Sequence, residues 1–327
     1  MTYGFRLFHM NLVPHHSRSP EVVPWVLPDG THYVHHASAC LDLLCGADRR
    51  LRAKPSWTTG VGNTDLPPYT AARGDKVVRW LTSQEISPRH LRATLAYGTV
   101  GSHDTALGET NNEDTPLGSR APSNPYRVEL IFGEQDEQGL LVVETQGRSC
   151  PVQSVARWLT VTSDLLGGTP TSGSERSIWK LETPAMVDRE HLRRLLMKGQ
   201  RVELMLKGTA PSPSGISSGN AFKVQFKIDE DEHRADLLGR FLERGNGQVP
   251  SPRDLLEVVS TDTLEGFDLT DGSITVEDET GEVKTVWLQR LDEVFTYSTG
   301  HELAPSEPDW TSAVRTKVGE VRPDLTW

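Results

Sequence analysis

Acidic and amide side chains near the middle of the chain are spaced as they would be in a divalent-metal site. They lie on a segment from Tyr126 to Thr145, where alternating apolar and polar residues around an acidic turn predict a hairpin. Two carboxylates on adjacent strands can hold Mg²⁺ for phosphodiester cleavage. The candidate residues are Glu129, Asp136, Glu144 and Gln146. The set lacks a lysine to stabilise the developing phosphorane, and the alternative is solvent-facing carboxylates on an amphipathic hairpin.

Histidines and cysteines near the N-terminus form a second candidate set. Six of the eleven histidines lie within the first 36 residues, and imidazole and thiolate groups both bind zinc. The alternative metal site consists of His32, His36, Cys40 and Cys45, in which His36 and Cys40 would share a helix face. The spacings match no established zinc pattern, which favours structural or surface histidines. The three cysteines include no CxxC pair, so we expect a reducing cytoplasm and no disulfide framework.

A G-x-S-x-G sequence occurs at residues 215–219, where the chain reads GISSG. As a nucleophile motif it needs a strand before the serine and a helix after it. Here a Pro/Ser-rich stretch precedes it and a predicted strand follows, so we interpret it as a hairpin loop. The phosphate-binding, dinucleotide-binding and HExxH motifs are absent from the sequence. We expect no cofactor, and the sequence favours a non-enzymatic protein.

A basic segment, residues 49–92, carries the most informative chemistry. It holds nine basic residues against three acidic ones, although the whole chain has a net charge of −11. Cations bind phosphates, and the interleaved rings of Trp57, Tyr69 and Trp80 could stack on exposed bases. The alternative is a solvated charged face with Trp80 in the core. The predicted nucleic-acid-binding residues are Arg49, Arg50, Arg52, Lys54, Arg73, Lys76, Arg79, Arg89 and Arg92.

The hydrophobic patterns predict an α+β fold in which antiparallel hairpins pack against helices and are joined by long loops. A serine cap followed by proline at Ser87-Pro88 predicts a short helix through Leu91 and Leu95. The other expected strands lie near 3–8, 77–81, 126–132, 139–145, 178–181, 202–206, 222–228, 274–276 and 283–288. The other expected helices lie near 35–45, 151–166, 188–198 and 230–244, and a closing helix places Trp310, Val314, Val318 and Val321 on one face.

Residues 98–125 form the clearest break in the sequence, because they show no periodicity. They are either a disordered insertion or a functional loop. We therefore expect an N-terminal α/β region at 1–125, with His-rich and basic segments, and an acidic α+β domain at 126–327. No apolar run approaches the ~20 residues needed to cross a bilayer. We expect a cytoplasmic protein without a membrane partner.

The order of elements over residues 126–244 resembles that of the RexA-type superinfection-exclusion proteins of temperate phages and prophages. The resemblance lies in the hairpin Tyr126–Thr145 with its following helix, and in the long-loop hairpin Val202–Ile228 before a polar helix. It implies a cytoplasmic DNA-binding component of phage defence that has no enzymatic site and acts with partners. It assigns no individual binding or catalytic residue, because it rests on the pattern of elements.

Two functional hypotheses follow from the sequence. The first is a non-enzymatic binding or interaction protein that contacts DNA through the basic segment, as part of a phage-defence or prophage-exclusion system, together with a protein partner or a second copy. The alternative is a metal-dependent nuclease or hydrolase that uses the hairpin carboxylates. A structural subunit also remains open, because the acidic residues 164–327 suit a basic protein partner.

Overall fold

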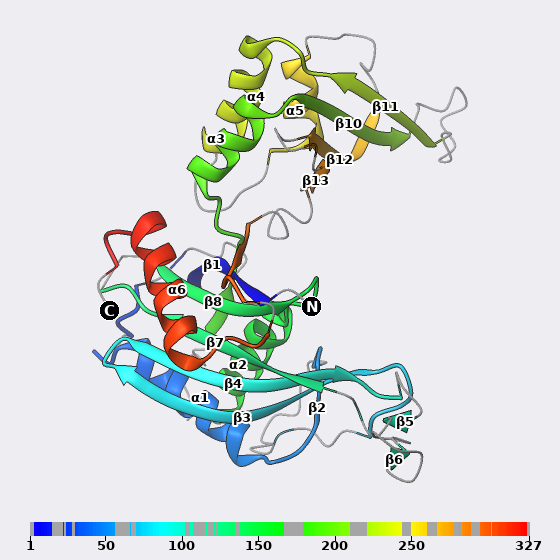
Figure 1. Ribbon diagram of the computed structural model, residues 1–327. Coiled ribbons are helices and arrows are strands. Elements are labelled where there is room, and N and C mark those ends of the chain that lie inside the picture. The colour runs from blue at the N-terminus through cyan, green and yellow to red at the C-terminus, as the bar shows by residue number, and fades with distance from the viewer. Residues whose placement is uncertain are drawn as a thin grey trace. The chain divides into compact units, whose positions relative to one another are not determined.

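The chain folds into two compact units in the computed structural model (Figure 1). The first unit comprises residues 1–183 and 297–327, and the second comprises residues 184–296. The second unit is therefore inserted into the first. None of the described helices is long and apolar enough to cross a membrane. The structure describes residues 3–14, 22, 24–27, 30–55, 66, 70–101, 105–106, 115–116, 121, 123–134, 138–166, 179–209, 221–243, 250–259, 267–277, 281, 283–288, 295–301 and 303–325.

An antiparallel sheet forms the centre of the first unit, with the strand order β14-β1-β8-β7-β4-β3-β2, and β9 also pairs with β1. The strands are β1 (Tyr3–Pro14), β2 (Leu51–Arg52), β3 (Lys76–Ser87), β4 (His90–Thr99), β7 (Ser123–Ile131), β8 (Gly139–Gln146), β9 (Trp179–Glu182) and β14 (Thr296–Ser298). The short strands β5 (Thr105–Ala106) and β6 (Thr115–Pro116) pair with each other. The predicted central hairpin is confirmed as β7 and β8.

Helices cover both faces of this sheet (Figure 1). Helices α1 (Tyr33–Gly46) and α2 (Val152–Leu166) lie on one face, and α6 (Glu307–Val321) lies on the other. Helix α6 begins after Ser306, whose hydroxyl accepts a hydrogen bond from the backbone N–H of Asp309, as an N-cap serine does. Its buried residues Trp310, Val314 and Val318 recur every four positions, so one stripe of the helix faces the sheet. This closing helix was predicted.

The second unit has an antiparallel sheet in the order β11-β10-β12-β13, with helices on one side of it (Figure 1). Its strands are β10 (Arg201–Thr209), β11 (Ala221–Lys227), β12 (Asp268–Glu277) and β13 (Val283–Trp287), and its helices are α3 (Arg189–Lys198), α4 (Asp231–Glu243) and α5 (Pro252–Val258). Alternate residues of β10, namely Val202, Leu204 and Leu206, are buried. The sequence predicts these strands together with α3 and α4, and the α+β class is correct.

Two sequence-based expectations are wrong. Residues 88–89 form a turn and Leu91 lies in β4, so no helix begins at Ser87-Pro88. Leu91 and Leu95 are four residues apart, as in a helix, but both are buried together with Ala93, and this alternation is that of a strand. The boundary expected between residues 125 and 126 falls inside one sheet, because β4 pairs with β7. The two units instead divide after residues 183 and 296.

Candidate nucleic-acid interface

The two hairpin carboxylates are buried, although the alternative expectation was that they face solvent. Glu129 on β7 is 0% exposed and Glu144 on β8 is 3% exposed. Both lie on the sheet face that α6 covers. Glu129 is contacted by the Nε1 of Trp310 from this helix, at 2.6 Å from its Oε1. Burial of a carboxylate is unfavourable unless it is paired, so its partners decide whether it could hold a metal.

Donors from three residues, two on β4 and one on α6, occupy both oxygens of Glu129. The Nε2 of His90 donates to Oε2 at 2.9 Å, while the Nε and Nη2 of Arg92 approach Oε1 at 3.1 and 2.8 Å. Burial by itself would raise the pKa of Glu129. The hydrogen bond from His90 and the charges of His90 and Arg92 outweigh burial and hold this pKa below its usual value. The carboxylate is ionised and fully hydrogen-bonded inside the protein.

Glu144 is held in a similar way by Arg127. Its Oε2 accepts the backbone N–H of Arg127 at 2.9 Å, and its Oε1 lies 3.3 Å from the Nη1 of the same residue. Burial raises the pKa of Glu144, although both contacts with Arg127 oppose this rise. Arg127 also donates to the backbone oxygen of Pro305 at 2.7 Å and lies 3.2 Å from Glu307. The pair therefore anchors the beginning of α6 to the sheet.

These contacts give no support to a metal site at the hairpin. The Nε2 of Gln146 donates to the backbone oxygen of Pro125 at 2.7 Å. Asp136 lies outside the described residues. No group of three or more His, Cys, Asp or Glu side chains within the described ranges could hold a metal ion. The carboxylates instead belong to a structural network, and its other members, His90, Arg127, Glu307 and Trp310, were missed at the level of sequence.

The N-terminal histidines and cysteines take part in separate contacts on and around α1. His32 caps the helix, and its Nδ1 accepts the backbone N–H of Val34. His36 lies 2.9 Å from the hydroxyl of Ser163, and Cys40 is fully buried. Burial raises the pKa of Cys40 to about 12, which disfavours the thiolate that a metal requires. Cys45, near the end of α1, is half-buried. The four residues form no metal-binding group.

The basic segment is divided by the fold. Arg92 is an internal residue that pairs with Glu129 and Glu307, and Arg89 at the β3–β4 turn pairs with Glu134 at 3.0 Å. Trp80 is buried, as the alternative interpretation expected, whereas Trp57 and Tyr69 lie outside the described residues. Arg89 and Arg92 therefore do not belong to a common cationic surface with the rest of the segment.

The other seven basic residues lie near β2 and the beginning of β3. The guanidinium of Arg49 donates to the backbone oxygen of Leu66 at 2.6 Å, and the Nζ of Lys76 lies 6.0 Å from the centre of the Tyr97 ring. Lys54, two residues after β2, is exposed, as is Arg73 in the turn before β3. The last three of the seven basic residues are Arg50, Arg52 and Arg79, and they share one face of the sheet.

Strand register places these three arginines together. Leu51 pairs with Val78 and Arg52 pairs with Val77, so the ladder brings Arg50 beside Arg79. Leu51 and Val78 are buried beneath the helical layer of α1 and α2, and the neighbouring residues in each strand point to the opposite face. Arg50, Arg52 and Arg79 are all exposed there. We call these three residues the β2–β3 cationic surface.

A small pocket of about 240 Å³ opens at this surface. Among the described residues, its lining comes from β3, β4, the beginning of β7 and the residues next to them. The lining residues are Arg50, Val77, Val78, Arg79, Ala96, Ala121 and Ser123. Ala121 and Ser123 belong to the end of the aperiodic stretch 98–125. The sequence alone could not place this stretch beside the basic segment.

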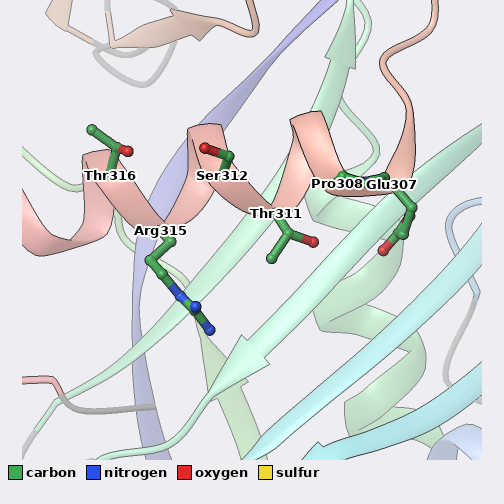
Figure 2. A pocket seen from close by; sticks show the side chains of 6 residues that line it. All are labelled: Glu307, Pro308, Thr311, Ser312, Arg315 and Thr316. Atoms are coloured by element: carbon green, nitrogen blue, oxygen red, sulfur yellow. The ribbon is translucent and has the colours of Figure 1, made fainter.

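A larger pocket of about 570 Å³ lies along α6 (Figure 2). Its described lining comes from this one helix, and consists of Glu307, Pro308, Thr311, Ser312, Arg315 and Thr316. In Figure 2, Thr311 and Arg315 point to one side of the helix, while Ser312 and Thr316 point to the other. Ligand sites gather polar groups from several directions, and Glu307 is already paired with Arg92 and Arg127. The smaller pocket is therefore the better candidate.

Comparison of the chain with protein-family models, curated proteins and solved structures finds no match. The resemblance to RexA-type proteins thus stays a prediction. The functional argument rests on the geometry of the β2–β3 cationic surface.

Proposed function

We propose that this protein is a non-enzymatic nucleic-acid-binding protein whose first unit binds phosphates through the β2–β3 cationic surface. The observation that carries this proposal is the shared position of Arg50, Arg52 and Arg79 on one exposed sheet face beside a pocket. Guanidinium groups bind phosphate oxygens in a bidentate way and keep their charge at every physiological pH. Three guanidinium groups on adjacent strands can contact several phosphates of one nucleic-acid backbone.

The surroundings of this surface are compatible with an external anion. Arg79 lies 4.0 Å from Asp48, and the two side chains are 49% and 91% exposed. An ion pair this long and this exposed contributes little, because water and salt screen it. A phosphate can therefore replace Asp48 as the partner of Arg79. Lys54 and Arg73 are exposed in the adjoining chain and add positive charge near the surface, whereas Lys76 shares the strand face of Val78.

The wider proposal follows the resemblance to RexA-type exclusion proteins. DNA is then the nucleic acid, the cytoplasm is the compartment, and the protein acts in phage defence with a protein partner or a second copy. The second unit is acidic, and it suits a protein partner better than a polyanion. Division of labour between a DNA-binding unit and a partner-binding unit is consistent with the insertion of one unit into the other.

The test is duplex binding by the full chain as a function of salt. For a 20-base-pair duplex, we expect the triple variant Arg50→Glu, Arg52→Glu, Arg79→Glu to bind at least tenfold more weakly than wild type at low salt. The slope of log K against log salt is negative, and its magnitude should decrease by about 0.9 for each phosphate that the variant no longer neutralises. Fluorescence anisotropy at several salt concentrations measures both quantities.

The matched control is Arg89→Glu, which reverses a charge at the far end of β3 where the arginine pairs with Glu134. It should leave the affinity and the slope close to those of wild type. Wild-type affinity in the triple variant would contradict the proposal. An equal loss in the control would instead indicate a general effect of net charge.

A further inference from the structure

The pocket at the β2–β3 cationic surface has two chemically different parts. Its apolar part, the floor, is made by Val77, Ala96 and Ala121, whereas Val78 contributes only backbone, because its side chain points to the opposite face of the sheet. Its polar groups are the guanidinium groups of Arg50 and Arg79 and the hydroxyl of Ser123. A ligand that matches both parts has a compact apolar body and an anionic group attached to it. An inorganic phosphate would satisfy the arginines and leave the floor empty.

Small side chains on neighbouring strands create the hollow. Ala96 on β4 is adjacent to Arg79 in the β3–β4 ladder, and on its other side Pro125 is its partner in β7. Two residues further along the same face, Gly98 pairs with Ser123. Ala96, Gly98 and Ser123 have little or no side chain above the sheet, whereas the arginines of β2 and β3 rise at its rim. Four adjoining chain segments thus form the pocket.

We infer that this pocket takes one unpaired nucleotide of a bound nucleic acid, with the base on the apolar floor and the adjacent phosphate on Arg50 and Arg79. This inference rests on the proposed function and makes it more specific. The volume of about 240 Å³ is below the roughly 300–1,000 Å³ of sites for drug-sized ligands, which favours a body as small as a single base. The planar guanidinium groups can also stack on the face of a base.

Base pairing decides which form of nucleic acid fits. In a duplex the faces of the bases are stacked within the helix, and only phosphates and groove edges are accessible. In a single strand, a loop or a frayed end, the base can leave the stack and enter a pocket. The protein should therefore bind single strands more tightly than duplexes of equal length, whereas a purely electrostatic surface would favour the duplex with its higher charge density.

The first experiment uses the wild-type full chain and three probes: a 20-nucleotide oligo-dT, an abasic strand of the same length, and a 20-base-pair duplex. We expect oligo-dT to bind about tenfold more tightly than the abasic strand, which carries the same phosphates without bases. Equal affinity for the oligo-dT and abasic strands would overturn the inference. It would leave the proposed phosphate binding intact, because that binding is measured by the arginine triple variant.

The second experiment fills the pocket without changing charge. Ala96→Leu should weaken oligo-dT binding about tenfold and leave the affinities for the abasic strand and the duplex within about twofold of wild type. Thr94→Leu is the matched control, because Thr94 lies on the same strand and face two residues away and does not line the pocket. An unchanged oligo-dT affinity in Ala96→Leu, with circular dichroism equal to that of wild type, would also overturn the inference.

Discussion

Replacement of Glu129 by glutamine tests whether the buried carboxylate joins α6 to the sheet. Glutamine keeps the shape of the side chain and one acceptor oxygen, but its NH₂ group replaces the other oxygen and faces the donor of His90 or the donors of Arg92 and Trp310. Removal of one partner of a buried ion pair costs about 3–5 kcal/mol. Arg92 keeps Glu307 as a second partner, so we expect a loss near the lower limit, about 3 kcal/mol. For a unit of this size, the melting temperature should fall by roughly 6–12 °C.

Thermal and urea unfolding of the full chain, followed by circular dichroism and tryptophan fluorescence, measure this loss at pH 7. The matched control is Glu134→Gln in the same hairpin, because Glu134 is 68% exposed and pairs with Arg89 at the surface. That change should cost no more than about 0.5 kcal/mol, as expected for an exposed ion pair. A loss below about 1 kcal/mol in Glu129→Gln would refute the structural role of this carboxylate.

The same variant gives a pH signature. The pKa of Glu129 is lowered in the folded protein, so the ionised carboxylate contributes stability above its unfolded pKa of about 4.5. This contribution is lost as the pH falls through the lowered folded pKa. Glutamine does not titrate, so the stability gap between wild type and Glu129→Gln should be largest near pH 7 and narrow below pH 4.5. A gap that stays constant from pH 7 to pH 3 would contradict the lowered pKa.

Two further predictions concern other parts of the fold. A Cβ at Gly208 would clash with the backbone oxygen of Asp268, so Gly208→Ala should destabilise the second unit by about 1–3 kcal/mol. Gly239→Ala in α4 has open space around it and should stabilise by up to about 1 kcal/mol; urea unfolding showing the same sign for both variants would contradict this. Iodoacetamide at pH 8 should label Cys45 and Cys150, which are partly exposed, and leave Cys40 unmodified until the protein unfolds. Peptide mass spectrometry separates the three thiols, and native labelling of Cys40 at the rate of Cys45 would contradict the buried site.

The local hydrophobic pattern was sufficient to predict an element where that element buries one face against its neighbours. The alternation in β10 and the four-residue stripe of α6 are visible in the sequence and are confirmed. The strands β7 and β8 form the predicted hairpin, but every residue of β8 is buried. Prediction failed at Ser87-Pro88, where a favourable helix start coincides with a turn between two strands. There, pairing of β4 with β3 and β7 on its two sides outweighs the local preference.

The buried network around Glu129 could not be predicted, because it depends on contacts between residues that are far apart in the sequence. Glu129 and Trp310 are separated by 181 positions in the chain, including the whole second unit, and are joined by a hydrogen bond. An acidic residue in an alternating strand is typical of a solvent-exposed face, and the sequence holds no signal that a helix will cover it. The nearest available signal was Trp310, because a buried indole needs an acceptor for its N–H.

The contacts of each basic side chain on this sheet face depend on how far α6 extends along the face. Arg92 and Arg79 lie on adjacent strands and point to the same side, but Arg92 meets Glu307 in the first turn of α6. Arg79 lies opposite Ala96, beside a pocket, where its nearest acidic partner is the exposed Asp48. One basic segment therefore supplies both an internal ion pair and the exposed surface that we propose binds phosphate.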